Sequence, residues 1–318
     1  MNILICSVGR RVKLIQYFKE ELHKVGGKVV AVDCDQTAAA LHHADMFEIV
    51  PRIDHPDYIP YLKKLCEKYN IKGVLSLIDP ELSLLAHVKE EFENDGIKIV
   101  VPDKRVVDIC YDKYRTYEFL LANDIPPVPT YIDINDLKND LNHKKIQFPL
   151  IIKPRNGSAS IGIYKVNCIE ELEPFKAEHQ DYIFQPYMGR EEFGADCYID
   201  LLSKEATNVF LKRKLNMRAG ETDKSIAIKD PMLKQVVERL IVALRPVGPI
   251  DIDFFRTENG YSVSEINPRF GGGYLHAHEM GQNFVENIIN NIRGETNSIA
   301  GEYEEGSTMV KYDHVMVI

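Results

Sequence analysis

The sequence lacks the features that would place it at a membrane or in an oxidising compartment. Its six cysteines are dispersed, and no two of them form a CxxC pair. No apolar run approaches bilayer length, and the start, MNILICSVGRR, lacks the apolar core and cleavage site of a signal peptide. These absences predict a soluble, reduced, cytoplasmic protein with no membrane partner.

Positive charge is also scarce. The 39 basic residues are outnumbered by 48 acidic ones, which gives a formal net charge of −9. No basic cluster with interleaved aromatic residues occurs, so nucleic acid is not expected as a partner. At 318 residues the chain is long for one core and suggests two or three structural units.

Two familiar phosphate-binding patterns are missing as well. The GxGxxG fingerprint is absent, which argues against a nicotinamide dehydrogenase, and GxxxxGK[ST] occurs nowhere. Any phosphate-binding segment must therefore be of another kind.

The first hundred residues alternate short apolar runs with amphipathic stretches, a pattern typical of parallel βαβ units. The expected strands are Ile3–Cys6, Val29–Val32, Met46–Val50, Val74–Leu77 and Ile97–Val101, and the clearest helices are Arg11–Val25, Tyr58–Tyr69 and Glu81–Asp95. Ligands of such sheets gather beyond the carboxyl ends of the strands, where Arg10, Arg11 and Asp79 stand. The arginines could hold an anion beside a helix N-terminus, or could be ordinary surface ion-pair partners.

Beyond residue 102 the pattern becomes mixed α and β. One helix is predicted over Val106–Asn123, with Lys113 inside it, and the buried strand Phe148–Lys153 ends in a lysine. The small-residue loop Gly157–Gly162 that follows is suited to laying amide and hydroxyl donors along a polyphosphate. An ordinary hairpin loop beside a solvated lysine is the alternative.

The segment IDIDFFRTENGYSVSEINPR is predicted to be a β-hairpin, because two β-rich runs flank the turn signal Glu-Asn-Gly. A three-residue turn over positions 258–260 would set Asp253 opposite Glu265 and Asp251 opposite Asn267, all on one face. A two-residue turn over Asn-Gly would put Asp253 and Glu265 on opposite faces, and we predict the longer turn. Carboxylates this close favour a cation between them, and oxygen ligands suit Mg²⁺; a solvated acidic face is the alternative.

Two further stretches are candidates for substrate contacts. Lys212 and Lys214 share one face of a predicted strand, with Arg218 just beyond, so one of the lysines could reach a phosphate; a solvated strand edge is equally compatible. The run Gly271–Gly273 precedes a helical stretch and would expose amide donors to a carboxylate. A closing strand is predicted over Thr308–Ile318.

The order of these motifs resembles the ATP-grasp superfamily, and within it the single-copy relatives of the carbamoyl-phosphate synthase large subunit. The resemblance covers nearly the whole chain and implies an α/β and α+β fold. A Rossmann-like (pre-ATP-grasp) parallel sheet would span residues 1–102 and an ATP-grasp fold residues 103–295, with the lid subdomain inside 113–186. Residues 296–318 would form a C-terminal tail and closing strand.

The resemblance also implies roles for single residues. It implies ATP contacts for Lys113, Lys153, Gly157, Ser158, Ser160, Gly162, Gln185, Pro186, Tyr187, Met188 and Glu192, metal binding for Asp253, Glu265 and Asn267, and a catalytic part for Arg269. The residue patterns add Lys212 and Arg218 as catalytic candidates, and Arg10, Arg11, Asp79, Gly272 and Gly273 as substrate contacts. Gln185 stands where the family often has Glu, and its carbonyl oxygen can still accept from an adenine amino group.

The activity implied is that of an ATP-dependent ligase forming a C–N bond. ATP and Mg²⁺ (or Mn²⁺) would activate a small carboxylate as an acyl phosphate, which an amine or thiol then attacks with release of ADP and phosphate. Carbamoyl phosphate is not expected as the product, because one ATP-grasp copy and no internal repeat are present. A nucleotide-binding protein without turnover and a carbamoyl-phosphate-synthase-like phosphorylating subunit are the alternatives, and a homodimer is the assembly considered.

Overall fold

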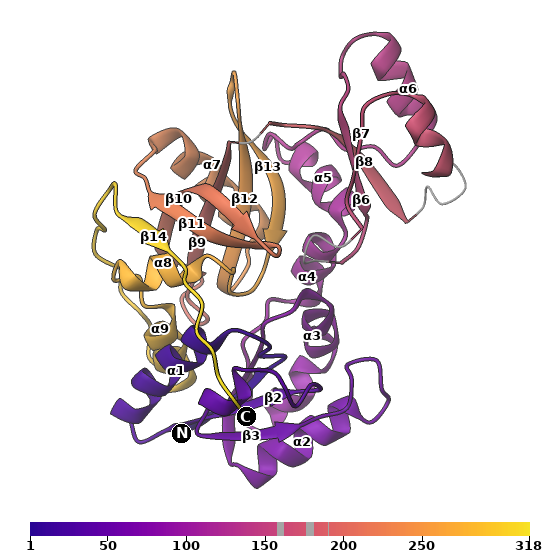
Figure 1. The fold of residues 1–318 in the computed structure, drawn as a ribbon. Coiled ribbons are helices and arrows are strands. Elements are labelled where there is room, and N and C mark those ends of the chain that lie inside the picture. The colour runs from indigo at the N-terminus through magenta and orange to yellow at the C-terminus, as the bar shows by residue number, and fades with distance from the viewer. Residues whose placement is uncertain (158–161, 176–180, 190) are drawn as a thin grey trace.

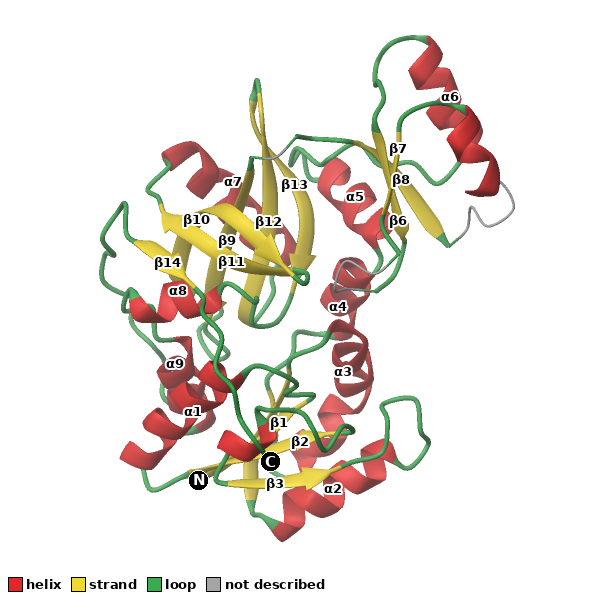
Figure 2. Ribbon diagram, in the orientation of Figure 1, coloured by secondary structure: helices red, strands yellow, loops and turns green. Residues whose placement is uncertain are grey.

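Three β-sheets organise the computed structural model, which describes residues 1–157, 162–175, 181–189 and 191–318 (Figure 1). A parallel sheet lies at one end, a large antiparallel sheet forms the body, and a small antiparallel sheet stands beside the body (Figure 2). This arrangement confirms the predicted α/β and α+β class, with the parallel sheet first in the chain. None of the helices in the described ranges combines the length and apolar character needed to span a bilayer.

The N-terminal sheet is parallel and has the strand order β3-β2-β1-β4-β5. Its strands are β1 (Asn2–Cys6), β2 (Lys28–Asp33), β3 (Met46–Ile49), β4 (Ile71–Ser76) and β5 (Lys98–Ile99), and its helices are α1 (Val12–Lys24), α2 (Tyr58–Lys68) and α3 (Asp79–Asn94). The central strands are nearly continuous apolar runs because both faces of the sheet are covered. The loops that follow the carboxyl ends of β1 and β4 line a cavity together with residues of the body and of the small sheet.

One face of this sheet is completed by a helix from much later in the chain. Helices α2 and α3 cover one face, while α1 and α9 (Phe284–Ile292) share the other. The approach of α9 is close, because a Cβ added to Gly73 of β4 would lie 2.4 Å from Ile292 Cδ1. Residues 1–102 therefore do not bury both faces of their sheet by themselves.

The helix predicted over Val106–Asn123 is two helices, so that prediction is wrong. They are α4 (Lys104–Tyr111) and α5 (Lys113–Ala122). Asp112 between them has an extended backbone (φ −100°, ψ 106°), and its side chain accepts hydrogen bonds from the amides of Tyr114 and Arg115. Asp112 is thus the N-cap of α5. A one-residue interruption leaves the apolar period almost unchanged, so the pattern could not reveal it.

The small sheet and one helix form a lid beside the body. Its strands and helix are β6 (Leu150–Pro154), β7 (Tyr164–Val166), β8 (Tyr182–Pro186) and α6 (Ile134–Asn142), with a short 3-10 helix over Glu170–Phe175. The strand order is β7-β6-β8, and α6 packs against one face through Ile134 and Leu137. The lid has a small core of its own, separate from that of the body.

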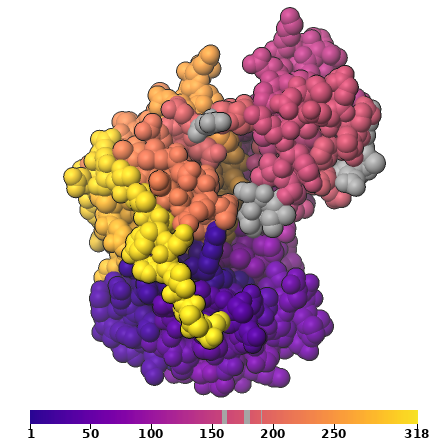
Figure 3. Space-filling model, viewed as in Figure 1, coloured from indigo at the N-terminus to yellow at the C-terminus, as the bar shows by residue number. Residues whose placement is uncertain are grey.

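The body is an antiparallel sheet of order β13-β12-β9-β10-β11-β14. Its elements are β9 (Glu192–Ile199), β10 (Ala206–Arg218), β11 (Glu221–Ala227), β12 (Gly248–Thr257), β13 (Gly260–Asn267), β14 (Thr308–Val310), α7 (Pro231–Leu244) and α8 (Tyr274–Glu279). The closing strand predicted over Thr308–Ile318 is too long, because pairing with β11 ends at Val310. The chain then runs across the surface toward the N-terminal sheet (Figure 3).

The β12–β13 hairpin pairs its acidic residues as predicted, through a different turn. Asp253 lies opposite Glu265, and Asp251 lies opposite Asn267. The turn itself is two residues long, since Thr257 pairs with Gly260, so the predicted three-residue turn is wrong. A bulge at Ser264 restores the register, because Phe254 pairs with Val263 while Asp253 pairs with Glu265. Such bulges re-aim side chains, and this one keeps the acidic residues on one face.

Candidate active site

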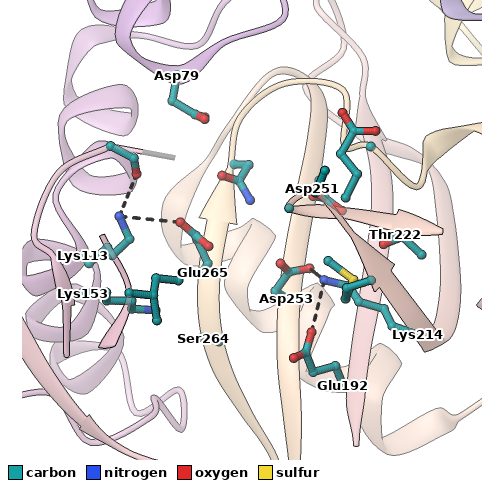
Figure 4. Close-up of a pocket in the computed structure, with 18 of the residues that line it drawn as sticks. Asp79, Lys113, Lys153, Glu192, Lys214, Thr222, Asp251, Asp253, Ser264 and Glu265 are labelled. Carbon is teal, nitrogen blue, oxygen red and sulfur yellow. Dashed lines mark hydrogen bonds and ion pairs between the residues drawn. The ribbon is translucent and has the colours of Figure 1, made fainter. Parts of the chain in front are cut away.

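A cavity of about 1090 Å³ lies where the three sheets meet. Its walls are the loops after β1 and β4, the lid strands β6 and β8, and the body strands β10, β12 and β13 (Figure 4). Pockets for small ligands usually measure roughly 300–1,000 Å³. The cavity is therefore large enough for a nucleotide together with a second small molecule.

Two lysines form the wall on the lid side. Lys113 at the start of α5 donates to the carbonyl oxygen of Gly157 at 2.7 Å, and its Nζ lies 3.7 Å from Glu265 (Figure 4). Lys153 at the end of β6 is buried and makes no ion pair with any described residue. Burial lowers the pKa of the Lys153 ammonium, and the positive charge of Lys113 adds to this effect against three opposing carboxylates, of which Glu265 has the largest influence. A buried cation without an ion-pair partner among the described residues is suited to an anionic ligand such as a polyphosphate.

The predicted metal residues lie together on the opposite wall. Asp253 and Glu265 come from paired positions of β12 and β13, and Asn267 follows two residues later on the same face. Burial raises the pKa of Asp253, and the carboxylates of Asp251 and Glu265 raise it further while Lys214 opposes them. The donor set therefore attracts cations and consists of oxygen atoms, which fits Mg²⁺.

Lys214 of β10 compensates part of this negative charge. Its Nζ is 2.5 Å from Asp253 and 3.9 Å from Glu192, and all three side chains line the cavity. The Lys214 side chain is more deeply buried than either carboxylate, and this low-dielectric environment strengthens its attraction to Asp253. Glu192, one of the predicted ATP contacts, thus stands next to the predicted metal set.

The predicted ATP contacts from Gln185 to Met188 line the cavity at the end of β8. The Gln185 amide nitrogen donates to Thr130 Oγ1 at 2.8 Å, and the Thr130 hydroxyl donates to Val128 O. Because a hydroxyl has one hydrogen, Thr130 must accept from Gln185, which leaves the Gln185 carbonyl oxygen as an acceptor for a ligand. The Tyr187 amide already donates to Pro149 O.

Two ion-pair clusters join the N-terminal sheet to the body across this cavity. Arg269 donates to Asp79 at 2.7 Å and to Asn267 at 3.3 Å, and its buried Nε has no partner among the described residues. Glu221 lies 3.4 Å from Arg10 and 3.1 Å from Arg11. All these residues line the cavity, so the crevice at the N-terminal sheet is built from charges of both signs.

Glu221 also binds Lys311 at 3.0 Å, so three cations surround one carboxylate. Arg10 further donates to the carbonyl oxygen of Ala219 at the tip of the β10–β11 hairpin. This cluster has a net positive charge. Glu221 was not among the predicted site residues, because nothing local in the sequence links it to two arginines more than two hundred residues earlier.

The three consecutive glycines are packed tightly against charged side chains. An added Cβ would lie 2.4 Å from Asp251 Cγ at Gly271, 2.7 Å from Glu221 Cγ at Gly272 and 2.5 Å from Lys212 Nζ at Gly273. Gly272 lines the cavity, whereas Gly271 and Gly273 do not. The glycine segment thus packs its backbone directly against charged side chains of the body sheet, where a larger residue would not fit. This packing role is separate from any contact with a substrate.

Two predicted catalytic residues are not brought into the cavity. Lys212 is fully buried, pairs with Asp196 and lies 3.8 Å from Asp251, beneath the glycine segment. Arg218 is held away by Asp223 and by Asp313 of the C-terminal segment. Their neighbour Lys214 lines the cavity instead. Strand periodicity predicted that either Lys212 or Lys214 could reach a phosphate, because it cannot show which of them a distant segment covers.

The loop predicted to cover phosphates is only partly described. Gly157 lines the cavity, and Gly162 lies past the gap with φ 72°. Ser158 and Ser160 fall outside the described residues.

Comparison with known proteins gives the class to which this architecture belongs. The family sequence model for the ATP-grasp domain matches residues 110–273, and that for the PylC-like N-terminal domain matches residues 3–100. The chain therefore belongs to the ATP-grasp domain family. The superfamily inferred from the motif order is confirmed, while the finer likeness to the carbamoyl-phosphate synthase large subunit stays a prediction.

The named relatives are ligases and a carboxylase. The chain is 21% identical over 287 residues to a phosphoribosylamine–glycine ligase of Methanocella arvoryzae, covering 80% of this chain and 65% of that protein. It is 24% identical over 200 residues to a D-alanine–D-alanine ligase of Corynebacterium aurimucosum, covering 55% and 56%. The biotin carboxylase domain of Hydrogenobacter thermophilus 2-oxoglutarate carboxylase, solved with MgADP, ADP and bicarbonate, superposes with a TM-score of 0.73 at 17% identity, covering 93% of this chain and 70% of that one.

The matches to eight curated relatives span from 25% to 70% of the lengths of those proteins. The predicted class of ATP-dependent ligase is the class of the two named ligases. ATP and Mg²⁺, predicted as cofactors, agree with the magnesium nucleotide bound in the solved relative.

We expect Gly271→Ala to destabilise the protein and impair the site. The new methyl group would meet the Asp251 carboxylate, with both oxygens at 2.7 Å, so either the glycine segment or the β12 strand must shift. Overpacking of this kind costs about 1–3 kcal/mol. Gly301→Ala is the matched control, since no heavy atom lies within 4 Å of its added Cβ. Thermal unfolding of the two variants at equal temperatures would contradict the close packing described for Gly271.

Proposed function

We propose that the chain is an ATP-dependent ligase that joins a carboxylate to an amine, or to a thiol, through an acyl phosphate. The observation that carries this proposal is the pair of facing walls in one cavity: Lys113 and Lys153 on one side, and Asp253 with Glu265 on the other (Figure 4). Transfer of a phosphoryl group to a carboxylate depends mostly on positioning and charge stabilisation, which this arrangement supplies. The names of the two related ligases support the same chemistry.

The nucleotide would lie between the lid and the body. Lys113 and Lys153 would offset phosphate charge, Gln185 would accept from the adenine amino group, and Glu192 would reach the ribose hydroxyls. These assignments are supported by the lining of the cavity and by the burial of Lys153 without an ion-pair partner among the described residues.

Asp253, Glu265 and Asn267 would hold Mg²⁺, which supplies charge neutralisation to the phosphates when bound. No three acidic, histidine or cysteine side chains converge as a metal cluster among the described residues. A site made of two carboxylates and one amide oxygen needs further ligands, and Mg²⁺ commonly takes these from substrate phosphates and water. We therefore expect metal and nucleotide to bind together.

Arg269 would stabilise the transferred phosphoryl group at the other end of the metal set. Its guanidinium is held by Asp79 and Asn267, so its position is fixed before any ligand arrives. Lys214, rather than the covered Lys212, would face the acyl phosphate.

The co-substrate would occupy the crevice at the N-terminal sheet. Charges of both signs meet there, with Arg10 and Arg11 against Glu221 and Arg269 against Asp79, which suits a zwitterionic or multiply polar molecule. The excess of cations around Glu221 favours a ligand with at least one anionic group.

The activity is tested by following ADP release from MgATP in the presence of pools of amino acids and small carboxylates. If ADP release depends on a particular pool, subdividing that pool would identify the acyl donor or acceptor. Nucleotide binding without release in any pool would favour a binding protein without turnover.

The paired substitution Glu265→Gln with Asn267→Ala should reduce turnover by about a hundredfold or more while leaving the fold intact. It removes one charged and one neutral oxygen donor from the metal set, and both side chains face the cavity. ADP release across a Mg²⁺ titration measures the effect, and thermal unfolding checks the fold.

The same hairpin offers a matched control. Glu258→Gln with Asn259→Ala makes the same two chemical changes at the exposed turn, outside this cavity. Wild-type turnover at limiting Mg²⁺ in the variant at positions 265 and 267 would remove the metal assignment.

Lys153→Met should lower kcat/KM for ATP about tenfold to a hundredfold without lowering thermal stability. Methionine keeps the apolar stem and deletes a buried charge that makes no ion pair with a described residue. Lys145→Met, at an exposed position of the lid, is the control. MgADP affinity in the Lys153 variant equal to that of the wild type would show that this lysine does not contact the nucleotide.

Arg11→Ala should raise KM for the co-substrate about tenfold and leave KM for ATP unchanged, because the lost group contributes charged hydrogen bonds in the crevice and not at the nucleotide. The control is Arg52→Ala, an exposed arginine in the loop that follows β3. An equal rise in both KM values would assign Arg11 to the interface between the sheets rather than to the co-substrate.

A further inference from the structure

An ion pair outside the cavity ties the lid to the junction between α4 and α5. Arg155 follows the last residue of β6, and its Nε and Nη2 donate to the two carboxylate oxygens of Asp112 at 2.8 Å and 2.7 Å. Asp112 belongs to the junction between α4 and α5, so the bond joins the lid sheet to the helices that lead out of the N-terminal sheet. Neither residue lines the cavity.

Asp112 serves two purposes at once. One of its oxygens caps α5 by accepting from the amides of Tyr114 and Arg115, while both oxygens accept from Arg155. The pair is partly buried, and the Tyr114 ring lies 5.8 Å from the guanidinium. A two-point bond between planar groups fixes orientation as well as distance.

The backbone on either side of this pair extends the connection to the nucleotide site. The Lys113 amide donates to Arg155 O at 3.1 Å, and Asp112 forms an isolated bridge with Asn156. The Lys113 side chain then donates to Gly157 O. Lys113 is the first residue of α5, so the placement of its Nζ depends on the helix start that Asp112 defines.

We propose that Asp112 and Arg155 are positioning residues for the nucleotide: their ion pair sets the start of α5 and the end of β6 so that Lys113 and Lys153 face the same phosphates. This inference rests on the proposed function, because it assumes that the two lysines contact a nucleotide. Two residues that lie outside the cavity would thereby determine where the lysines are placed. Lys153 lies in β6, two residues before Arg155, so the same ion pair constrains the positions of both lysines.

The cap and the ion pair can be separated by mutation. Asp112→Asn keeps an N-cap acceptor of the same shape and deletes the charge that Arg155 needs. Arg155→Gln deletes the guanidinium and leaves the cap intact. Arg155→Lys keeps the charge and loses the two-point geometry, so it should fall between the wild type and Arg155→Gln.

A matched control lies in the lid itself. Asp133 is the N-cap of α6, accepts from the Asn135 amide and makes no ion pair with a described residue. Asp133→Asn therefore repeats the chemical change of Asp112→Asn at a cap without a guanidinium.

The experiment is calorimetric titration of the full chain with MgADP, together with thermal unfolding of every variant. We expect the MgADP Kd to rise about tenfold in Asp112→Asn and in Arg155→Gln, and to stay at the wild-type value in Asp133→Asn. The double variant Asp112→Asn with Arg155→Gln should bind no more weakly than either single variant, because both remove the same interaction. Melting temperatures should not follow the same order, since a merely structural role would lower stability and affinity together.

Three results would overturn the proposal. Wild-type affinity in both single variants would show that the ion pair does not position the lysines. Equal weakening of MgADP binding in Asp133→Asn would show that the effect comes only from the loss of a charged N-cap. Additive losses of affinity in the double variant would show that the two residues act separately. A wild type that binds no MgADP overturns the proposed function along with this inference. If the wild type binds MgADP and the single variants bind it with the same affinity, only the inference about Asp112 and Arg155 is overturned.

Discussion

The central constraint on this structure is the burial of opposite charges on facing walls with only partial compensation inside each wall. Lys113 and Lys153 stand on one wall, and the acidic residues of the β12–β13 hairpin stand on the other. Like charges grouped in a low-dielectric space are costly, and the cost is lowest when a ligand of mixed charge joins the two groups. A magnesium nucleotide has that composition, with anionic phosphates for the lysines and a cation for the carboxylates.

Much of the surrounding architecture serves to keep these charges apart from water and from one another. The glycine segment lies directly over Asp251 and Lys212, and Lys214 partly neutralises Asp253. The N-terminal part of the chain closes the far end through Arg11, which pairs with Glu221, and Asp79, which pairs with Arg269. Each contact comes from a different sheet or loop, so the site exists only when the three sheets are assembled.

The sequence carries those parts of the fold that local patterns encode. Continuous apolar runs indicated the parallel sheet, and alternation along the β12–β13 segment was enough to place Asp253 opposite Glu265. The bulge at Ser264 left no trace, because one extra polar residue is indistinguishable from a longer turn. Features set by tertiary contact were equally hidden: the break at Asp112 depends on its cap and on Arg155, and the choice between Lys212 and Lys214 depends on a segment some sixty residues later.

The packing of α9 on the N-terminal sheet has a consequence for how the chain folds. Strands β1 to β5 are made first during synthesis, yet the face that α9 covers stays incomplete until residues up to Ile292 have emerged. Contacts between elements so far apart in sequence raise the contact order and slow folding, because a long loop must close before they form. During that interval apolar side chains of this face, among them Ile3 and Val29, stand partly open to solvent, which exposes the nascent parallel sheet to misassociation.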